Sequence, residues 1–275
     1  MTKGSVMSSY KLYGPLAAAL LATIATTVSA QDADAPNPLL TRRGWEIGGQ
    51  VSKYKYEEPG LMNLEGERIG FVGAYNFTNH NRVYSRIDLR VSYGKLDYES
   101  FGTGSSSDIP DWIGEVRAVV GRDYLVGEGL ALSPYIGLGY RYLYNDLRGY
   151  SSTGAVGYRR YSEYFYAPIG VTMRMRAGDQ WVFAPTVEYD AFIGGKQKSK
   201  LSDTGLGFSD AYNDQDRGRG YRVYLMVEGR RWAFGPWLHY WKIKDSDVVP
   251  IGFGFGGLEP ENWTREYGFE FRYRF

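Results

Sequence analysis

The sequence contains no cysteine and only two histidines, His80 and His239, among its 275 residues. The lack of cysteine excludes disulfide frameworks and thiolate metal sites. The scarcity of histidine leaves few candidates for a histidine-based catalytic centre. A large excess of one charge is also lacking, with 32 basic and 31 acidic residues. This balance argues against a nucleic-acid-binding protein, which carries a basic surplus.

A long apolar run is lacking everywhere after residue 30, so no transmembrane helix of about 20 residues is expected there. The run at 12–28 follows the positive residues Lys3 and Lys11 and ends at the small residues 28–30. This order is that of a secretory signal peptide, so residues 1–30 are expected to be removed, with a retained anchor as the alternative. Removal of the two lysines leaves 30 basic and 31 acidic residues, a net charge of −1.

The clearest signal that is present is the alternation of aromatic and polar residues in the last thirteen residues, 263–275. Successive side chains of a β-strand point to opposite faces, so the pattern predicts a strand with one aromatic and one polar face. Its length exceeds the usual strand of about five or six residues and fits a tilted membrane strand. The aromatic face consists of Trp263, Tyr267, Phe269, Phe271, Tyr273 and Phe275.

Similar alternation recurs about ten times along the chain. The segments are 45–56, 68–77, 86–93, 115–120, 132–142, 164–174, 181–191, 221–228, 234–241 and 263–275. They predict an all-β fold, a single antiparallel up-and-down transmembrane β-barrel of about ten strands over residues 44–275, with eight strands as the alternative. Residues 31–43 are expected to form a periplasmic N-terminal tail or a plug inside the barrel.

The connections between these segments alternate in length. Short turns are expected at 78–81, 126–129, 177–179 and 230–231, and long polar loops at 57–66, 97–110, 145–160, 195–220 and 245–262. Short turns on one rim and long loops on the other are typical of outer-membrane barrels, whose long loops lie outside the cell.

A soluble barrel that holds its apolar face inside is the alternative to a membrane barrel. The membrane interpretation is favoured because the apolar faces carry too many large side chains to fill one small lumen. Tryptophans also fall near strand ends, where interfacial girdles belong. These are Trp45, Trp112, Trp181, Trp232 and Trp263.

The stretch YGFEFRYRF at 267–275 resembles the terminal strand of outer-membrane barrel proteins, which ends in phenylalanine after alternating aromatic or aliphatic residues. The stretch PYIGLGYRY at 134–142 is similar to a strand of the OmpA-like and Opa-like outer-membrane superfamily. This resemblance implies a place in the outer membrane of a Gram-negative cell. It also implies that the terminal strand is recognised by the barrel assembly machinery. It implies little about activity, and that superfamily usually has eight strands.

The polar strand faces carry charges of both signs that are expected to point into the lumen. The expected network comprises Arg86, Asp88, Arg90, Glu115, Arg117, Arg141, Arg174, Glu188, Asp190, Arg222, Glu228, Glu266, Glu270 and Arg272, with Arg68, Arg230 and Arg274 as further basic members. Arginine forks suit carboxylates, so these groups are expected to pair and close the narrow lumen. The alternative is a narrow diffusion channel with mixed-charge walls.

An outer-membrane enzyme, a protease or a lipid A-modifying barrel, is the third hypothesis. His80 falls in an expected periplasmic turn, and His239 is expected to be packed between Trp237 and Trp241. Glu188 and Asp190 could share a proton, but arginines expected across the lumen favour ion pairing. We therefore expect no enzyme, no cofactor and no metal site.

The expected partners are outer-membrane lipid, lipopolysaccharide, the assembly machinery and an extracellular ligand bound through the loops, but not nucleic acid. The basic cluster Lys196, Lys198 and Lys200 is a candidate contact for polyanions, with a solvated loop as the alternative. The function favoured by the sequence is a structural or surface-interaction role.

Overall fold

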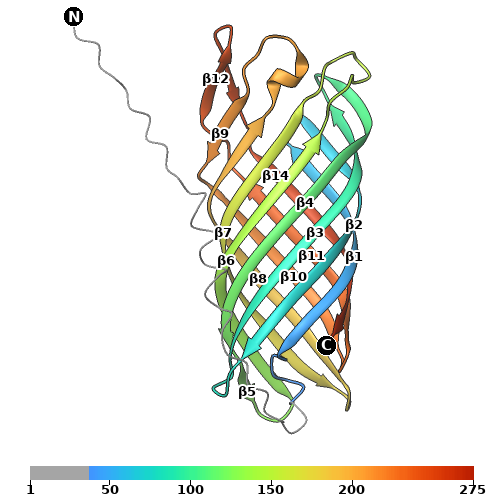
Figure 1. Ribbon diagram of the computed structural model, residues 1–275, viewed down its shortest axis with the longest axis vertical. Helices are drawn as coiled ribbons and strands as arrows, with labels where there is room; N and C mark the ends of the chain where they lie inside the picture. The colour runs from blue at the N-terminus through green and yellow to red at the C-terminus, as the bar shows by residue number, and fades with distance from the viewer. Residues whose placement is uncertain (1–36) are drawn as a thin grey trace, which may run out of the picture. The chain divides into compact units, whose positions relative to one another are not determined.

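The computed structural model describes residues 37–275, so the predicted signal peptide at 1–30 lies outside the described residues. Ten antiparallel strands form a closed barrel (Figure 1), because each pairs with the next and β14 pairs back with β1. The strands are β1 (Gly44–Glu58), β2 (Met62–Thr78), β3 (Val83–Ser100), β4 (Gly104–Arg122), β6 (Leu130–Asp146), β7 (Arg159–Ala177), β8 (Trp181–Ser199), β10 (Gly218–Glu228), β11 (Trp232–Ile243) and β14 (Asn262–Arg274). The predicted ten-stranded barrel is confirmed, and the eight-stranded alternative is wrong.

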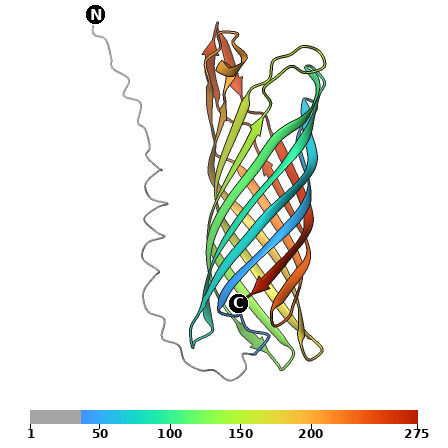
Figure 2. The same cartoon turned by 45° about the vertical axis from the view of Figure 1, so that its right-hand side comes forward.

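Four short strands and one helical turn lie at the ends of this barrel. The turn end carries the tight turns and β5 (Tyr124–Val126), and the outer end carries β9 (Ala211–Gln215), the β12–β13 hairpin (Val248–Gly252 and Phe255–Leu258) and the 3-10 turn Leu201–Thr204 (Figure 1). The chain ends at the turn end, beside the start of β1 (Figure 2). No helix among residues 37–275 is long and apolar enough to cross a membrane.

Apart from Arg122 at the turn end of β4, every barrel strand has its first outward charge at one position toward the outer end. Below this position, toward the turn end, the outward residues are mostly apolar, as Val51, Phe71 and Leu89 are. The first outward charges are Lys53, Glu67, Lys95, Asp108, Asp146, Glu163, Lys196, Arg219, Lys242 and Arg265, here called the charged ring. An uncharged band closed by a ring of charge is what a barrel in a bilayer requires. The membrane-spanning part therefore lies between the turn end and this ring.

Two of the predicted long loops are wrong. Residues 57–66 and 97–110 belong almost entirely to strands, which are joined by the short turns 59–61 and 101–103. Outside the membrane the outward face no longer needs to be apolar, so the alternation fades while backbone pairing continues, as between Glu65 and Asp97. The prediction at 145–160 is closer, because residues 147–158 lie between β6 and β7.

The lumen is filled in successive layers. Residues 37–43 enter it at the turn end, where Leu39 is fully buried and the Thr41 amide donates to Asp123 Oδ2 at 2.7 Å. Charged side chains follow in the middle, and beyond them lies an apolar core inside the barrel wall. That core contains Tyr54, Tyr56, Leu64, Leu96, Ile109, Ile113, Leu143, Tyr164, Tyr166, Trp241 and Ile243.

Candidate functional site

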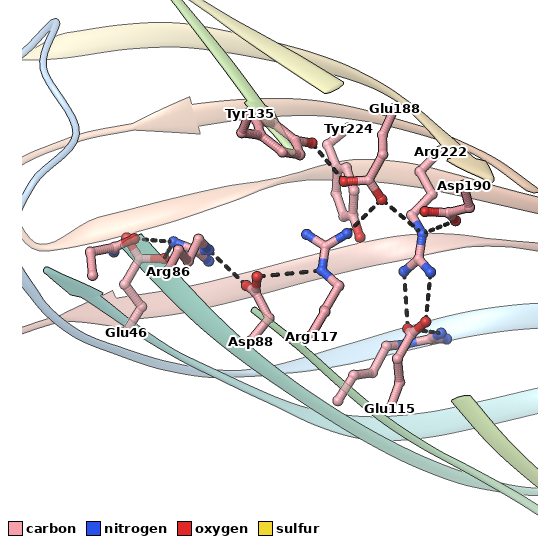
Figure 3. A network of polar contacts seen from close by, with 12 residues as sticks. Glu46, Arg86, Asp88, Glu115, Arg117, Tyr135, Glu188, Asp190, Arg222 and Tyr224 are labelled. Carbon is pink, nitrogen blue, oxygen red and sulfur yellow. Dashed lines mark hydrogen bonds and ion pairs between the residues drawn. The ribbon is translucent and has the colours of Figure 1, made fainter. Parts of the chain in front are cut away.

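The middle of the lumen is bridged by arginines and carboxylates (Figure 3). Arg222 on β10 donates from Nη2 to Glu115 Oε1 at 2.6 Å and from Nη1 to Glu115 Oε2 at 3.0 Å. Its Nε lies 2.7 Å from Asp190 Oδ2 and 3.1 Å from Glu188 Oε1. Because Glu115 is on β4 and the other two carboxylates are on β8, Arg222 joins strands that do not neighbour each other.

The ion pairs continue from Glu188 toward β1 (Figure 3). Arg117 lies 2.5 Å from Glu188 Oε1 and 3.3 Å from Asp88 Oδ2. Asp88 also accepts from Arg86 Nε at 2.7 Å, and Arg86 Nη1 donates to Glu46 Oε2 at 3.0 Å. Four strands, β1, β3, β4 and β8, are linked by this series of contacts.

The terminal strand extends the network toward the turn end. Arg272 Nε lies 2.8 Å from Glu270 Oε1. Arg274 Nε donates to Glu46 Oε1 at 3.0 Å, and its Nη2 donates to Glu228 Oε2 at 3.3 Å. The polar face of the aromatic terminal strand therefore takes part in the lumen ion pairs.

Arg174 connects this network to the segment before β1. Its Nε lies 3.4 Å from Glu228 Oε2. Its Nη1 donates to Ser133 Oγ at 3.0 Å and to Thr41 Oγ1 at 3.2 Å. The entering segment is thus fixed by charged groups of the barrel wall as well as by the burial of Leu39.

A further set of pairs lies on the outer side of the charged layer. Arg90 Nη2 is 2.5 Å from Glu266 Oε1, and Arg68 Nη1 is 3.7 Å from Glu266 Oε2. Arg68 also pairs with Asp111, which accepts a hydrogen bond from Asn145. All of these side chains except Asn145 carry charge, and all are buried.

Two arginines of the predicted lumen network do not form the expected ion pairs. Arg141 is buried, but no carboxylate among residues 37–275 lies within 4 Å of it, and its guanidinium instead stacks 5.5 Å above Trp241. The reason is that its ladder neighbour Glu115 is already occupied by Arg222 and by the Tyr166 hydroxyl. Arg230 is exposed in the turn between β10 and β11, so its predicted place in the lumen is wrong.

Three lumen carboxylates were not predicted from the sequence: Glu46, Asp111 and Asp123. Glu46 and Asp111 have outward tryptophans as neighbours, Trp45 and Trp112. Strict alternation from these tryptophans would have placed both carboxylates inside. Asp123 follows β4, where no alternation guides the assignment.

A small cavity lies within the charged layer. The cavity in it, lined by residues such as Asp88, Glu115, Arg222 and Glu270, has a volume of about 20 Å³. That is about the room needed for one water molecule, for which roughly 10–15 Å³ suffices.

A larger cavity of about 560 Å³ opens at the outer end, beyond the charged ring. Glu58, at the end of β1, and Glu259, after β13, lie on its wall together with Arg160 near the start of β7. Arg160 Nη2 donates to Glu58 Oε1 at 2.8 Å and also contacts Glu259 Oε1. The Tyr56 hydroxyl lies 2.7 Å from Glu58 Oε1 and 3.0 Å from Glu259 Oε1. We call these four residues the outer acidic cluster.

The surroundings of Glu259 alter its titration. Burial raises its pKa to about 7; the Arg160 guanidinium opposes this rise, and the nearby Glu58 carboxylate adds to it. Glu259 therefore holds a proton near neutral pH, because a second carboxylate and a single arginine face it. No pattern predicted this cluster, because Glu58 and Glu259 fall in stretches expected to be loops.

The histidines do not lie in this outer cavity. His239 is buried in the lumen, with Nε2 2.7 Å from the Tyr224 hydroxyl and Nδ1 3.4 Å from Arg90 Nη1. His80 is in the short turn between β2 and β3. Among residues 37–275, no three His, Cys, Asp or Glu side chains converge as metal ligands.

The three lysines of the predicted basic cluster are not in a loop. Lys196 and Lys198 lie on β8, and Lys200 directly follows it. Lys196 is 3.5 Å from Asp214, Lys200 pairs with Asp210, and Lys198 lies 4.9 Å above the ring of Tyr212. Neighbouring groups on β9 and just before it therefore balance most of the cluster.

The aromatic residues of the terminal strand all belong to its outward face. Tyr267, Phe269, Phe271 and Phe275 are exposed, and Tyr273 is half-buried. The backbone amide of Phe275 donates to the Trp45 carbonyl at 3.0 Å. The terminal strand thus closes the barrel through its backbone and leaves its aromatic face toward the membrane.

Comparison with solved structures shows the same kind of fold. The outer membrane protease OmpT from Escherichia coli matches with a TM-score of 0.55 and 11% identity, over 84% of this chain and 97% of that chain. The translocator domain of the autotransporter NalP from Neisseria meningitidis has a TM-score of 0.39 and 12% identity, over 86% and 90%. The attachment invasion locus protein Ail of Yersinia pestis has a TM-score of 0.33 and 12% identity, over 85% and 100%. At such low identity the likeness to OmpT concerns the fold alone.

No curated protein sequence matches the chain. The family model described as outer membrane protein beta-barrel domain matches residues 18–213, which is more than half of the sequence. This match and the closed barrel agree on a location in the Gram-negative outer membrane. The chain belongs to the outer membrane protein beta-barrel domain family.

Proposed function

We propose that the protein is a closed outer-membrane barrel with a structural or surface-interaction role performed at its outer end. The observation that carries this proposal is the bridged lumen, where Arg222 and Glu115 join opposite walls beside a cavity of about 20 Å³. A hydrated ion or solute has no passage through such a layer while the ion pairs persist.

Two further layers support a closed barrel. The segment that contains Leu39 fills the turn end, and aromatic and aliphatic side chains such as Tyr54, Tyr166 and Trp241 fill the lumen beyond the charges. Both layers would have to move before a channel could form, because each of them fills the lumen at its own height. Packed protein interiors resist such movement, because lost contacts are not replaced.

The outer end is where the chain offers surface and space for a partner. Its strands continue past the charged ring, and we propose that the basic ring residues Lys53, Lys95, Lys196, Lys242 and Arg265 meet lipopolysaccharide phosphates. We assign lipopolysaccharide contact to this ring rather than to the lysine cluster of β8 alone, because the ring lies on all ten strands at the height where the uncharged outward band ends. The outer cavity offers the space for a ligand.

A channel is tested by conductance. The purified chain, refolded and inserted into a planar bilayer, is expected to show no stable single-channel steps. An open porin refolded in the same detergent serves as the control for insertion. Reproducible steps from this chain would overturn the closed-barrel proposal.

A second arm of the same test uses the double variant Glu188→Ala, Asp190→Ala. In a closed barrel it removes one of the two carboxylate partners of Arg117 and two of the three partners of Arg222, and lowers resistance to heat unfolding. In a channel its main effect would be a change of ion selectivity. The two readouts separate the closed barrel from the narrow diffusion channel.

We propose binding rather than catalysis as the role of the outer end. Neither histidine reaches the cavity, and its carboxylates Glu58 and Glu259 are engaged by Arg160 and Tyr56. Turnover of lipid A or peptide by the purified chain, lost on His239→Ala, would contradict this choice.

A further inference from the structure

The outer cavity combines an apolar wall with one charged corner. Its volume of about 560 Å³ falls within the roughly 300–1,000 Å³ of small-molecule sites. Most of the wall is apolar or aromatic and comes from several strands and the outer loops. Its apolar part includes Met62, Tyr98, Ile109, Leu147, Val156 and Ile251. A cavity with this lining favours a ligand with an apolar body.

The charged corner is the outer acidic cluster. Glu58, Glu259 and Arg160 are each more than nine-tenths buried, at 6%, 6% and 7% exposure. Both carboxylates use the same atom, Oε1, to accept from Arg160 and Tyr56. Within residues 37–275 the Oε2 atoms of Glu58 and Glu259 accept no hydrogen bond, and neither atom is sealed off by protein. These two acceptors are free for a donor in the cavity that both residues line.

The charges of the cluster do not cancel. With both carboxylates ionised, two negative charges face the single positive charge of Arg160. Several basic side chains elsewhere at the outer end have acidic partners of their own: Arg159 binds Asp203, and Lys242 and Lys244 bind Glu261. None of these residues lines the cavity. A buried negative charge without a partner is unfavourable, so the corner favours either a proton or a bound cation.

We propose that the outer cavity binds a small amphipathic organic cation, with an ammonium group at the two free carboxylate oxygens and an apolar body along the wall. This inference rests on the proposed closed barrel, because it takes the cavity as a blind site rather than the mouth of a channel. An ammonium group donates three hydrogen bonds and supplies the missing positive charge. An alcohol of the same length supplies one donor without charge, and a carboxylate meets repulsion.

The sequence allows a clean test because the chain has no cysteine. Ser106 lines the cavity, and its hydroxyl makes no hydrogen bond to the described residues, so Ser106→Cys introduces one thiol there. The full chain is placed in phosphatidylcholine nanodiscs, and the rate of thiol modification by N-ethylmaleimide is measured with octylammonium, octanol or octanoate. At about four times its Kd, octylammonium is expected to slow the reaction about fivefold, because the free fraction is then about one fifth. Octanol should protect less and octanoate should not protect.

Two variants test whether protection by octylammonium depends on the outer acidic cluster. Protection by octylammonium should be lost when Ser106→Cys is combined with Glu58→Gln and Glu259→Gln. The matched control is Glu261→Gln, which removes a nearby carboxylate that binds Lys242 and Lys244 outside the cavity and should leave protection intact. Folding of each variant is checked by its heat-dependent mobility on a gel.

If the double glutamine variant does not fold, pH provides the second measurement. Protection by octylammonium, taken as the ratio of rates with and without the probe, should be weaker at pH 6 than at pH 8. The reason is that a proton on Glu259 then competes with the ammonium group. The groups that face Glu259 are Glu58 and Tyr56 of β1, Arg160 and Tyr164 of β7, and Tyr158 before β7. Burial raises the pKa of the three tyrosines above the ordinary value of 10, so none of them titrates between pH 6 and 8.

Each result decides the proposal. Equal protection by all three probes would overturn the cation preference and leave only an apolar cavity. Absence of protection by octylammonium, or protection that persists in the folded double variant, would overturn the site. The conductance test addresses the closed barrel independently, so a silent barrel without probe protection refutes this inference alone.

Discussion

Arg222 of β10 and Glu115 of β4 form a two-pronged hydrogen bond across the lumen, at 2.6 and 3.0 Å. Both side chains are nearly fully buried, and they come from strands that do not pair with each other. The contact thus holds opposite walls of the barrel at a fixed separation. It also determines which other groups can pair, since Arg141 next to Glu115 on the ladder is left to stack on Trp241.

The first prediction concerns this pair. Arg222→Met keeps a long side chain but leaves Glu115 and Asp190 buried without their main cationic partner. Breaking a buried pair costs about 3–5 kcal/mol, so the free energy of unfolding should fall by that amount. Urea titration in detergent, followed by the mobility of folded and unfolded forms on a gel, measures the change.

The control for this change is the exposed pair Lys95 and Asp108, whose side chains are 59% and 74% exposed. Lys95→Ala should cost less than about 1 kcal/mol because surface pairs contribute little. Equal losses for the two variants would mean that the lumen contact has no special part in stability.

Much of this fold follows from the sequence because a membrane barrel obeys one simple constraint. Outward residues between the turn end and the charged ring must be apolar, and this made segments such as 267–275 and 134–142 readable as strands. The same constraint explains where prediction failed. Beyond Lys53 and Lys95 water replaces lipid, and either face can be polar, so strand residues there looked like loops.

The sequence predicted which charged side chains point into the lumen better than it predicted which of them form ion pairs. Alternation places Glu188, Asp190 and Arg222 inside, but which of them meet depends on strand tilt and on contacts across the barrel. The outer acidic cluster could not be predicted from the sequence at all. Glu58 and Glu259 are 201 positions apart in the numbering and meet through the closure of the barrel and the fold of the β12–β13 hairpin.

The second prediction tests the membrane band. Leu89 lies on the outward face of β3, midway between the turn end and Lys95, and is 46% exposed to the surroundings of the barrel. Leu89→Lys should lower the free energy of unfolding in lipid by about 2–4 kcal/mol, the cost of a lysine at the bilayer midplane. Tyr93→Lys, on the same face next to the ring, should cost about 0–1 kcal/mol by its depth.

Unfolding of both variants is measured in phosphatidylcholine vesicles by denaturant titration. The ratio of the two losses is the informative quantity, because both variants add the same charge to the same strand. A larger loss at Tyr93 than at Leu89 would place the membrane at a different height along the barrel.

The third prediction concerns pH. Glu259 has a folded pKa of about 7, above its ordinary value of 4.5, because it is buried beside Glu58. The folded state therefore holds this proton more tightly than the unfolded state. The stability that the proton contributes is full below pH 4.5 and is lost as pH rises through 7. The wild-type chain should resist heat unfolding better at pH 5 than at pH 8.

Glu259→Gln should flatten this dependence between pH 5 and 8, by between about 1 and 3 kcal/mol for a shift of this size. The control is Glu261→Gln, because Lys242 and Lys244 hold the pKa of Glu261 at about 2, outside this pH range. If Glu259→Gln retains the wild-type slope, the pH dependence originates elsewhere in the barrel.

The last prediction concerns the end of the chain. We propose that Phe275 serves recognition by the assembly machinery more than stability, because its side chain is 64% exposed, its ring packs edge-on against Tyr273, and its backbone donates the hydrogen bond to Trp45. Phe275→Ala keeps that hydrogen bond. The variant should therefore refold in detergent with a stability close to that of the wild type, while the amount of folded barrel in the outer membrane of expressing cells decreases.

Ile47→Ala is the control for Phe275→Ala. Ile47 is an exposed apolar residue of β1 that pairs with Tyr273, and its replacement should leave assembly in cells unchanged. A variant Phe275→Ala that loses stability in detergent as much as it loses assembly in cells would show that Phe275 acts through the fold. Equal assembly of Phe275→Ala and the wild type would show that the terminal aromatic residue is not needed for recognition.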